Sequence, residues 1–367
     1  MRSLLVAVTV VAALTGCGEV VATGGHGGTS SCAPTVDATL RGVAMRIYAQ
    51  AAGGPNVVSA TRRLARSPAL ARAIERGDAA RTRAALRPLL RSQIHRIVVT
   101  RGRRVLASVG TGPPLLAPVR GVIRDAGGRT VGRYTLAVGD QAAITGIIRA
   151  LTGAEVRLLP AGDRAPASAT ASFAATAFPA TPERLWLVGG AAPACASTPA
   201  RTAAATIGAV ATRLYRVEAG GPSTRRVLRH VARDRRFAAA VARDDPVALR
   251  AAIVRFFRTH SLHVVRVRAT TVSGRLVGDV GGPFVLAPAS SAVREPGGRV
   301  VGRVTLSVQD DTGYIKLIRR FTGAGVAMRT AAGAVPGSTR AGSAPAFTFT
   351  ATAFPRGALT VALVSPA

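Results

Sequence analysis

VGRYTLAV at residues 131–138 and VGRVTLSV at residues 301–308 are closely similar segments that lie 170 positions apart in the chain. Upstream of them, the Gly-Gly-Pro of residues 53–55 recurs at residues 220–222, at an offset of 167, so small length changes fall in the loops. Self-similarity at a fixed period predicts a duplicated fold. We therefore predict two tandem units of about 165 residues that join near residues 190–200.

Each unit is predicted to begin with helices and to continue with strands. An apolar stripe at helical spacing covers residues 40–48, recurs over residues 207–215, and stops at the repeated Gly-Gly-Pro in both units. Asp78 and Asp245 are suitable N-caps for a later helix in each unit. Strands are predicted over residues 95–100, 103–109, 129–138, 170–176 and 184–188, and over residues 263–270, 275–280, 299–308, 346–352 and 359–364. In each unit, one short helix that ends at Thr-Gly lies among these strands. Helices followed by a mostly antiparallel sheet indicate an α+β fold.

The first residues have the pattern of a bacterial secretion signal. Arg2 precedes an apolar run over residues 4–14, which is shorter than the roughly 20 residues that a membrane-spanning helix needs. The run ends in Leu-Thr-Gly followed by Cys17, which resembles the lipobox of bacterial lipoproteins. We therefore predict a signal peptide over residues 1–16, lipidation of Cys17, a flexible tether over residues 17–32, and folded units over residues 33–190 and 195–367. An ordinary cleaved signal with a chance cysteine is the alternative.

The other two cysteines are candidates for a disulfide. Once Cys17 is assigned to a lipid, Cys32 and Cys195 remain, each just upstream of the first helix of its unit. Paired cysteines in a secreted protein tend to form a bridge. We predict a Cys32–Cys195 disulfide, which requires Cα atoms within about 7 Å of each other.

The chain is strongly basic, with a formal net charge of +32. Such a charge favours anionic partners such as lipid headgroups, envelope polymers or nucleic acid. The basic residues are almost all arginine, with Lys316 as the one lysine, and they are spread through the chain among many Ala, Gly and Pro residues, as a GC-rich genome would produce. Aromatic residues make up 4% of the chain, too few to build stacking platforms for single-stranded nucleic acid. We therefore predict no nucleic-acid partner.

The repeated pattern resembles a known family of extracellular domains. In the first unit, SPALARAIERGDAARTRAALRPLL leads into HRIVVTRGRRVLASVG; in the second, RRFAAAVARDDPVALRAAIVRFF leads into VVRVRATTVSGRLVGDVG. This order resembles the Cache domains of bacterial sensing, which have a PAS-like sheet under an N-terminal helix. The resemblance implies two tandem Cache units, and a pocket on the sheet that takes an amino acid, an amine or a carboxylate. Because no recognisable output segment follows, we expect a separate membrane signalling partner.

The second unit holds the candidate ligand residues. The resemblance implies that an aspartate at the end of the repeated strand meets a ligand amino group, and Asp310 is the closest match, with Asp311 as the alternative. Arg266 could bind a ligand carboxylate through its planar guanidinium. The competing interpretation is that one aspartate caps a helix, that the other pairs with a surface arginine, and that the arginines face solvent. The full set of predicted ligand-binding residues is Asp310, Asp311, Tyr314, Arg266, Phe284 and Asp279.

The sequence offers little for metal binding or catalysis. His260 and His263 are three residues apart, but they straddle a helix end and a strand start, where helical geometry does not bring them together. No phosphate-cradling glycine loop and no nucleophile-elbow serine is present. We therefore predict no metal site, no cofactor and no enzymatic activity.

These observations predict a small-ligand-binding sensory lipoprotein on the outer face of the cell membrane. In the alternative, the chain is a structural or adhesive envelope protein whose cationic surface binds anionic polymers. Charge-driven attachment weakens steeply with ionic strength, so salt dependence distinguishes the two.

Overall fold

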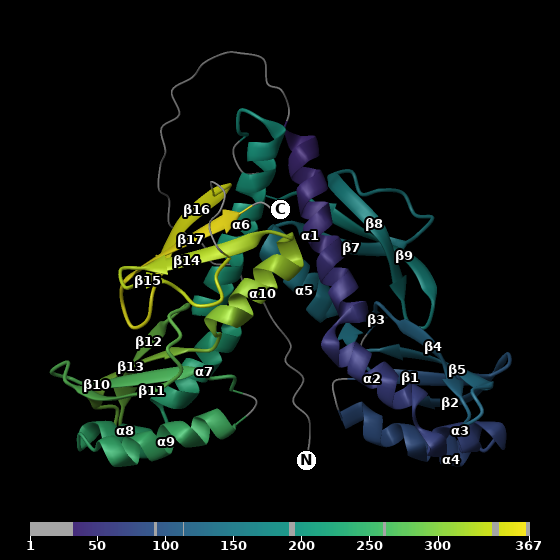
Figure 1. Ribbon diagram of the computed structural model, residues 1–367, viewed down its shortest axis with the longest axis horizontal. Helices are drawn as coiled ribbons and strands as arrows, with labels where there is room; N and C mark the ends of the chain where they lie inside the picture. The colour runs from purple at the N-terminus through teal and green to yellow at the C-terminus, as the bar shows by residue number, and fades with distance from the viewer. Residues whose placement is uncertain are drawn as a thin grey trace. The chain divides into compact units, whose positions relative to one another are not determined.

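The structure is a computed structural model that describes residues 32–91, 94–112, 114–190, 195–259, 262–339 and 345–364. The predicted signal peptide, Cys17, most of the tether and His260 lie outside the described residues. The chain divides into two compact units between Cys195 and Ala196. Each unit is described by itself below, and Figure 1 labels their elements.

Unit 1 opens with four helices whose ends follow from proline, glycine and polar caps. Pro55 follows the extended Gly54 and starts the second helix. The side chain of Ser67 accepts a hydrogen bond from the Leu70 amide (3.3 Å), and that of Asp78 accepts one from the Arg81 amide (2.9 Å). The elements are α1 (Ala33–Gly53), α2 (Pro55–Ala65), α3 (Pro68–Glu75) and α4 (Ala79–Leu86), followed by a 3-10 turn, η1 (Arg87–Arg91).

The strands of unit 1 form two antiparallel sheets rather than the single sheet that the sequence predicts. The first has the order β2-β1-β5-β4 and the second has the order β6-β3-β8-β9-β7. Helix α5 (Gln141–Thr152) follows β6 in sequence and is capped by Gly153, whose φ of 74° suits glycine. The strands are β1 (Arg96–Arg101), β2 (Arg104–Val109), β3 (Leu115–Leu116), β4 (Val119–Arg124), β5 (Thr130–Ala137), β6 (Gly139–Asp140), β7 (Glu155–Pro160), β8 (Ala169–Ala177) and β9 (Thr181–Val188).

Unit 2 repeats the order of the longer elements, while the two-residue strands β3, β6 and β15 each occur in one unit only among the described residues. Its sheets have the orders β11-β10-β13-β12 and β15-β14-β17-β16. Its helices are α6 (Pro199–Gly220), α7 (Pro222–Ala232), α8 (Arg235–Ala242), α9 (Pro246–Arg258) and α10 (Asp311–Thr322). Its strands are β10 (Arg266–Thr271), β11 (Leu276–Gly281), β12 (Ala289–Arg294), β13 (Val300–Ser307), β14 (Gly325–Thr330), β15 (Gly333–Ala334), β16 (Phe347–Thr352) and β17 (Ala358–Val364). The predicted α+β fold is confirmed.

The duplication extends to individual hydrogen bonds. In unit 1, the Tyr48 hydroxyl accepts a hydrogen bond from the Thr176 amide (2.8 Å) and so ties α1 to β8. In unit 2, the Tyr215 hydroxyl accepts one from the Thr352 amide (2.9 Å) and ties α6 to β16. Each long helix is thus fastened to the second sheet of its own unit by one tyrosine.

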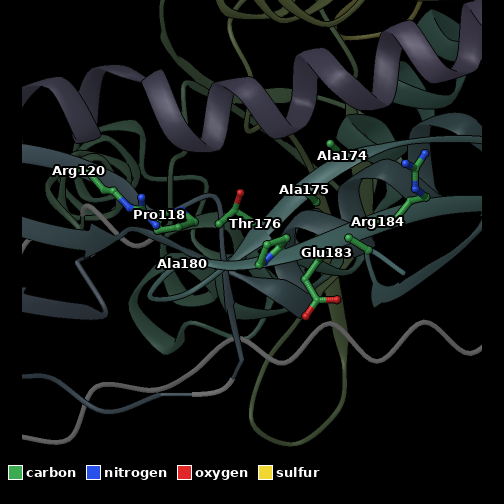
Figure 2. A pocket seen from close by; sticks show the side chains of 10 residues that line it. Pro118, Arg120, Ala174, Ala175, Thr176, Ala180, Glu183 and Arg184 are labelled. Carbon is green, nitrogen blue, oxygen red and sulfur yellow. The ribbon is translucent and has the colours of Figure 1, made fainter. Parts of the chain in front are cut away.

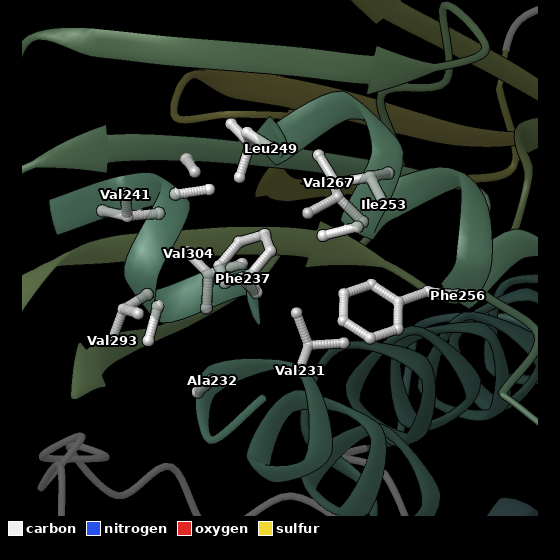
Figure 3. Close-up of a cluster of buried hydrophobic side chains, with 14 of the residues drawn as sticks. Val231, Ala232, Phe237, Val241, Leu249, Ile253, Phe256, Val267, Val293 and Val304 are labelled. Carbon is white, nitrogen blue, oxygen red and sulfur yellow. The ribbon is translucent and has the colours of Figure 1, made fainter. Parts of the chain in front are cut away.

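In unit 2, helices α7, α8 and α9 cover one face of the first sheet, which leaves the other face for polar residues. Figure 3 shows Phe237 and Phe256 from the helices packed against Val267 and Val304 from the strands. Burial of one such side chain stabilises the fold by about 1.5–3 kcal/mol. Along β10, buried Val267 and Ala269 alternate with half-buried Arg266 and Arg268. Because neighbouring residues of a strand point to opposite faces, the arginines lie on the face that the helices do not cover.

No helix in the part of the chain that the structure describes combines the length and the apolar character that a membrane crossing requires.

Candidate ligand-binding site

A polar row crosses the uncovered face of the first sheet in unit 2. In the strand register, Arg268 of β10 lies opposite Asp279 of β11 on one side and Thr305 of β13 on the other. Thr305 in turn lies opposite Ser290 of β12, and their hydroxyls are 2.8 Å apart. The helix-covered face of the same strands is apolar, so the polar groups of this sheet gather on one side.

Arg266 and Asp279 form an ion pair at the edge of this row. The Arg266 guanidinium donates to both carboxylate oxygens of Asp279, at 2.9 and 2.8 Å, and to the backbone oxygen of Phe284 at 3.0 Å. It also lies 4.3 Å from the ring centroid of Phe354. Unit 1 has the same kind of stack, with Arg96 5.3 Å from the ring centroid of Phe178. Arg266 is therefore engaged by protein groups, and its stacking is a feature that both units share.

The two aspartates at the start of α10 hold backbone amides. Asp310 accepts a hydrogen bond from the Gly313 amide at 2.6 Å, as a helix N-cap does. Asp311 accepts hydrogen bonds from the amides of Val285 and Leu286, at 3.1 and 2.9 Å from its Oδ1 atom. Asp310 is therefore the aspartate that caps the helix, as the competing interpretation proposed. Asp311 holds the loop before β12 instead of pairing with a surface arginine.

Burial governs the ionisation of Asp311. Its side chain is almost completely covered, and desolvation raises the pKa of its carboxyl above the ordinary aspartate value. The hydrogen bonds from Val285 and Leu286 oppose this shift, and the charge of Arg266 opposes it as well. Neighbouring Asp310 adds a smaller upward contribution to the pKa.

The predicted pocket of Asp310, Arg266, Tyr314 and Phe284 needs correction at Tyr314. This ring is 0% exposed, and its hydroxyl donates to the backbone oxygen of Ala211 on α6 at 3.0 Å. The residue belongs to the buried side of α10, which faces α6, so it cannot form the wall of an open pocket. Of the other predicted residues, Arg266, Asp279, Phe284 and Asp311 do lie together, but in a network whose polar groups bind one another and the backbone.

A hollow next to this network is lined by arginine side chains. It has a volume of about 480 Å³ and lies on the uncovered sheet face, bordered by the β10–β11 turn and the β16–β17 turn. Arg268, Arg303 and Arg356 line it together with Thr270 and Thr305. Arg268 lies 3.5 Å from Asp279, whereas Arg303 and Arg356 are exposed and form no ion pair with the described residues. Three guanidinium groups and two hydroxyls therefore converge on one hollow.

Unit 1 has a hollow of similar size with a different charge. Its volume is about 460 Å³, and Figure 2 shows Arg120 of β4 and Glu183 and Arg184 of β9 at its edges. The residue after the repeated Phe-Pro is Arg356 in unit 2 but Ala180 in unit 1. Within the repeat, Val98 takes the place of Arg268. The cluster of arginines on the sheet face is thus particular to unit 2.

Arg303 and Arg356 are candidate residues that the sequence analysis missed. Arg303 lies inside the repeated segment at 301–308, and Arg356 follows a proline in a turn. In a chain with so many arginines, neither stands out alone. The available signal was the difference between the repeats, because Ala180 and Val98 replace two of the three arginines in unit 1.

Two further predictions concern cysteine and histidine. Cys32 and Cys195 are joined by a disulfide, with their Cα atoms 5.6 Å apart. His263 begins the approach to β10 with a φ of 50°, which suits a turn at the strand entry. Within the described ranges, no three His, Cys, Asp or Glu side chains gather as a metal site would require.

Comparisons with known proteins find little that resembles this chain. No family model matches it, and no curated protein matches its sequence. Among solved structures, it is similar to the periplasmic domain of Vibrio cholerae LuxQ, with a TM-score of 0.31 and 11% sequence identity, over 44% of this chain and 98% of that one. The proposals below therefore rest on the chain's own residues.

Proposed function

We propose that the chain is an extracellular binding protein of the Cache type whose second unit holds a small organic anion on the uncovered face of its first sheet. The observation that carries the proposal is the convergence of Arg268, Arg303 and Arg356 on one hollow of about 480 Å³. That volume lies within the range of about 300–1,000 Å³ that is typical of small-molecule sites.

The chemistry of the hollow favours a carboxylate over an amine. Guanidinium groups bind carboxylates in a planar, two-point geometry, and the hydroxyl of Thr270 can donate to a further oxygen. Asp279, the carboxylate that lies beside Arg268, already binds Arg266 through both of its oxygens, so the described lining presents positive charge to a ligand. The ligand class thus narrows from amino acids, amines and carboxylates to molecules with at least one carboxylate.

The remaining parts of the proposal come from the sequence. The lipobox-like segment supports an anchor at Cys17 on the outer face of the cell membrane, and Cys17→Ser should release the protein from the membrane fraction of cells. The chain would report ligand occupancy to a separate membrane partner. The proposal assigns it a binding role and no reaction.

A thermal-shift screen tests the ligand class. The protein without its signal peptide is melted with mono- and dicarboxylates, amines and amino acids. A bound ligand at about 100 times its Kd stabilises the folded state by about 2.7 kcal/mol and raises the melting temperature. We expect carboxylates to raise it and simple amines to leave it unchanged.

A matched pair of variants assigns the site. Arg303→Ala should abolish the carboxylate shift, whereas Arg133→Ala, at the same place in the repeat of unit 1, should retain it. The two substitutions remove the same charge from exposed positions. Equal loss in both variants, or stabilisation by amines alone, would contradict the proposal.

A further inference from the structure

A second basic surface lies on the helices of unit 2. A shallow, open depression of about 610 Å³ lies where α7, α8 and α9 meet, and we call it the arginine cleft. Six arginines line it: Arg226, Arg229, Arg233, Arg235, Arg236 and Arg255. The helices pack their apolar sides on the sheet, so the cleft and the sheet-face hollow belong to opposite sides of that sheet.

The charge of the arginine cleft is hardly neutralised within the protein. Asp234 supplies the one carboxylate of its lining, and both oxygens of that carboxylate bind Arg255, at 2.9 and 2.8 Å. The same side chain also caps α8 through the Phe237 amide. The other five arginines are exposed, and none of them forms an ion pair within the described parts of the chain. Arg229 on α7 and Arg233, the C-cap of that helix, are four residues apart, a spacing at which like charges repel each other.

The repeat shows which arginines of the cleft unit 1 lacks, because Arg229 and Arg233 correspond to Arg62 and Arg66 whereas the other four have no arginine counterpart. At an offset of 167, Arg226 and Arg236 correspond to Ser59 and Ala69 of unit 1, and Arg255 corresponds to Pro88. Both units have the same helices there, α2 with α3 and α7 with α8, with equal lengths. The equivalent helices of unit 1 therefore form without arginine at these positions, so α7 and α8 do not need Arg226 and Arg236 in order to fold.

We propose that the arginine cleft binds a flexible anionic polymer that carries a phosphate group in each repeat. Several guanidinium groups along a cleft match a chain of successive phosphates, because each can form a charge-assisted, two-point contact. Among the described lining residues, His230 has the only aromatic ring, so the cleft lacks a surface on which nucleic-acid bases would stack.

This site is separate from the proposed carboxylate site and defines where an adhesive function would reside. It would hold the second unit against the envelope polymer while the sheet face remained open to small ligands. The two proposals can fail independently, because Arg303→Ala should leave polymer binding unchanged.

Fluorescence anisotropy with a labelled poly(glycerol phosphate) oligomer tests the proposal on the chain without its signal peptide. The test variant, Arg226→Ser with Arg236→Ala, introduces the residues of unit 1. The control variant, Arg319→Ala with Arg320→Ala, removes two exposed arginines from α10. We expect the test variant to bind at least about tenfold more weakly at low salt and to lower the slope of log K against log salt by about 1.4, while the control stays close to the wild type. If the test variant melts at a lower temperature than the wild type, Arg229→Gln with Arg233→Gln replaces it.

Four outcomes would overturn the proposal. Equal weakening in the test and control variants would mean that net charge alone attracts the polymer. Binding to vesicles of anionic phospholipid but not to the oligomer would assign the cleft to a membrane surface. Tighter binding of oligothymidylate with the same number of phosphates would indicate a nucleic-acid site. Competition by inorganic phosphate at an equal phosphate concentration would indicate a site for one small anion.

Discussion

Asp311 shows what a single buried carboxylate does in this fold. Its oxygens hold the amides of Val285 and Leu286, and in unit 1 the corresponding residue is Gln141. Its role could not be predicted from the sequence, because the amides that it binds are 25 and 26 residues away in the chain. The role of Asp310 could be predicted as one of two alternatives, since an aspartate before a helical stripe is a common N-cap.

The raised pKa of Asp311 gives a pH dependence of stability. Between the ordinary aspartate pKa, about 3.9, and the higher folded-state pKa, the folded state binds more protons than the unfolded state, so stability falls as the pH rises through this window. Asp311→Asn keeps an oxygen that can accept from the amides and removes the titration. Urea unfolding at a series of pH values should show that the free energy of unfolding falls less with rising pH in the variant than in the wild type. Identical pH profiles for the wild type and the variant would show that Asp311 has the same pKa in the folded and the unfolded state.

Individual strands and helix caps could be predicted from the sequence, because they depend on residues that are close together in the chain. The strands at 129–138 and 299–308 are confirmed as Thr130–Ala137 and Val300–Ser307. Asp78 and Asp245 are confirmed as caps because a cap depends on residues within one turn. The division of the strands into two sheets per unit was not predicted, since pairing between distant strands leaves no local signal.

The cap of α9 provides a test at this scale. Asp245 accepts hydrogen bonds from the amides of Val247 and Ala248, at 3.1 and 2.9 Å. Asp245→Ala should lower the free energy of unfolding by about 0.5–2 kcal/mol, and Asp245→Ser should restore most of it. Chemical denaturation followed by circular dichroism measures both. An unchanged midpoint in the alanine variant would mean that the cap contributes nothing to α9.

For the whole molecule, the duplication makes each unit a control for the other. The Cys32–Cys195 disulfide spans 163 residues and lies within unit 1. Cys32→Ser with Cys195→Ser should lower the stability of unit 1 by about 2–5 kcal/mol, because the bridge restricts the unfolded chain. Differential scanning calorimetry should show one transition moving down and the transition of unit 2 staying in place. A shift of the unit 2 transition instead would contradict this assignment.

The central claim is that unit 2 holds a small organic anion through three arginines, two of which unit 1 lacks. Isothermal titration calorimetry measures it most directly, with the carboxylate that gives the largest thermal shift and with a variant that introduces the residues of unit 1, Arg268→Val with Arg356→Ala. We expect one binding site per chain in the wild type. Because each hydrogen bond to a charged group contributes about 1.5–3 kcal/mol, the variant should bind at least about tenfold more weakly. An affinity that the double substitution leaves unchanged would place the ligand elsewhere and contradict the account.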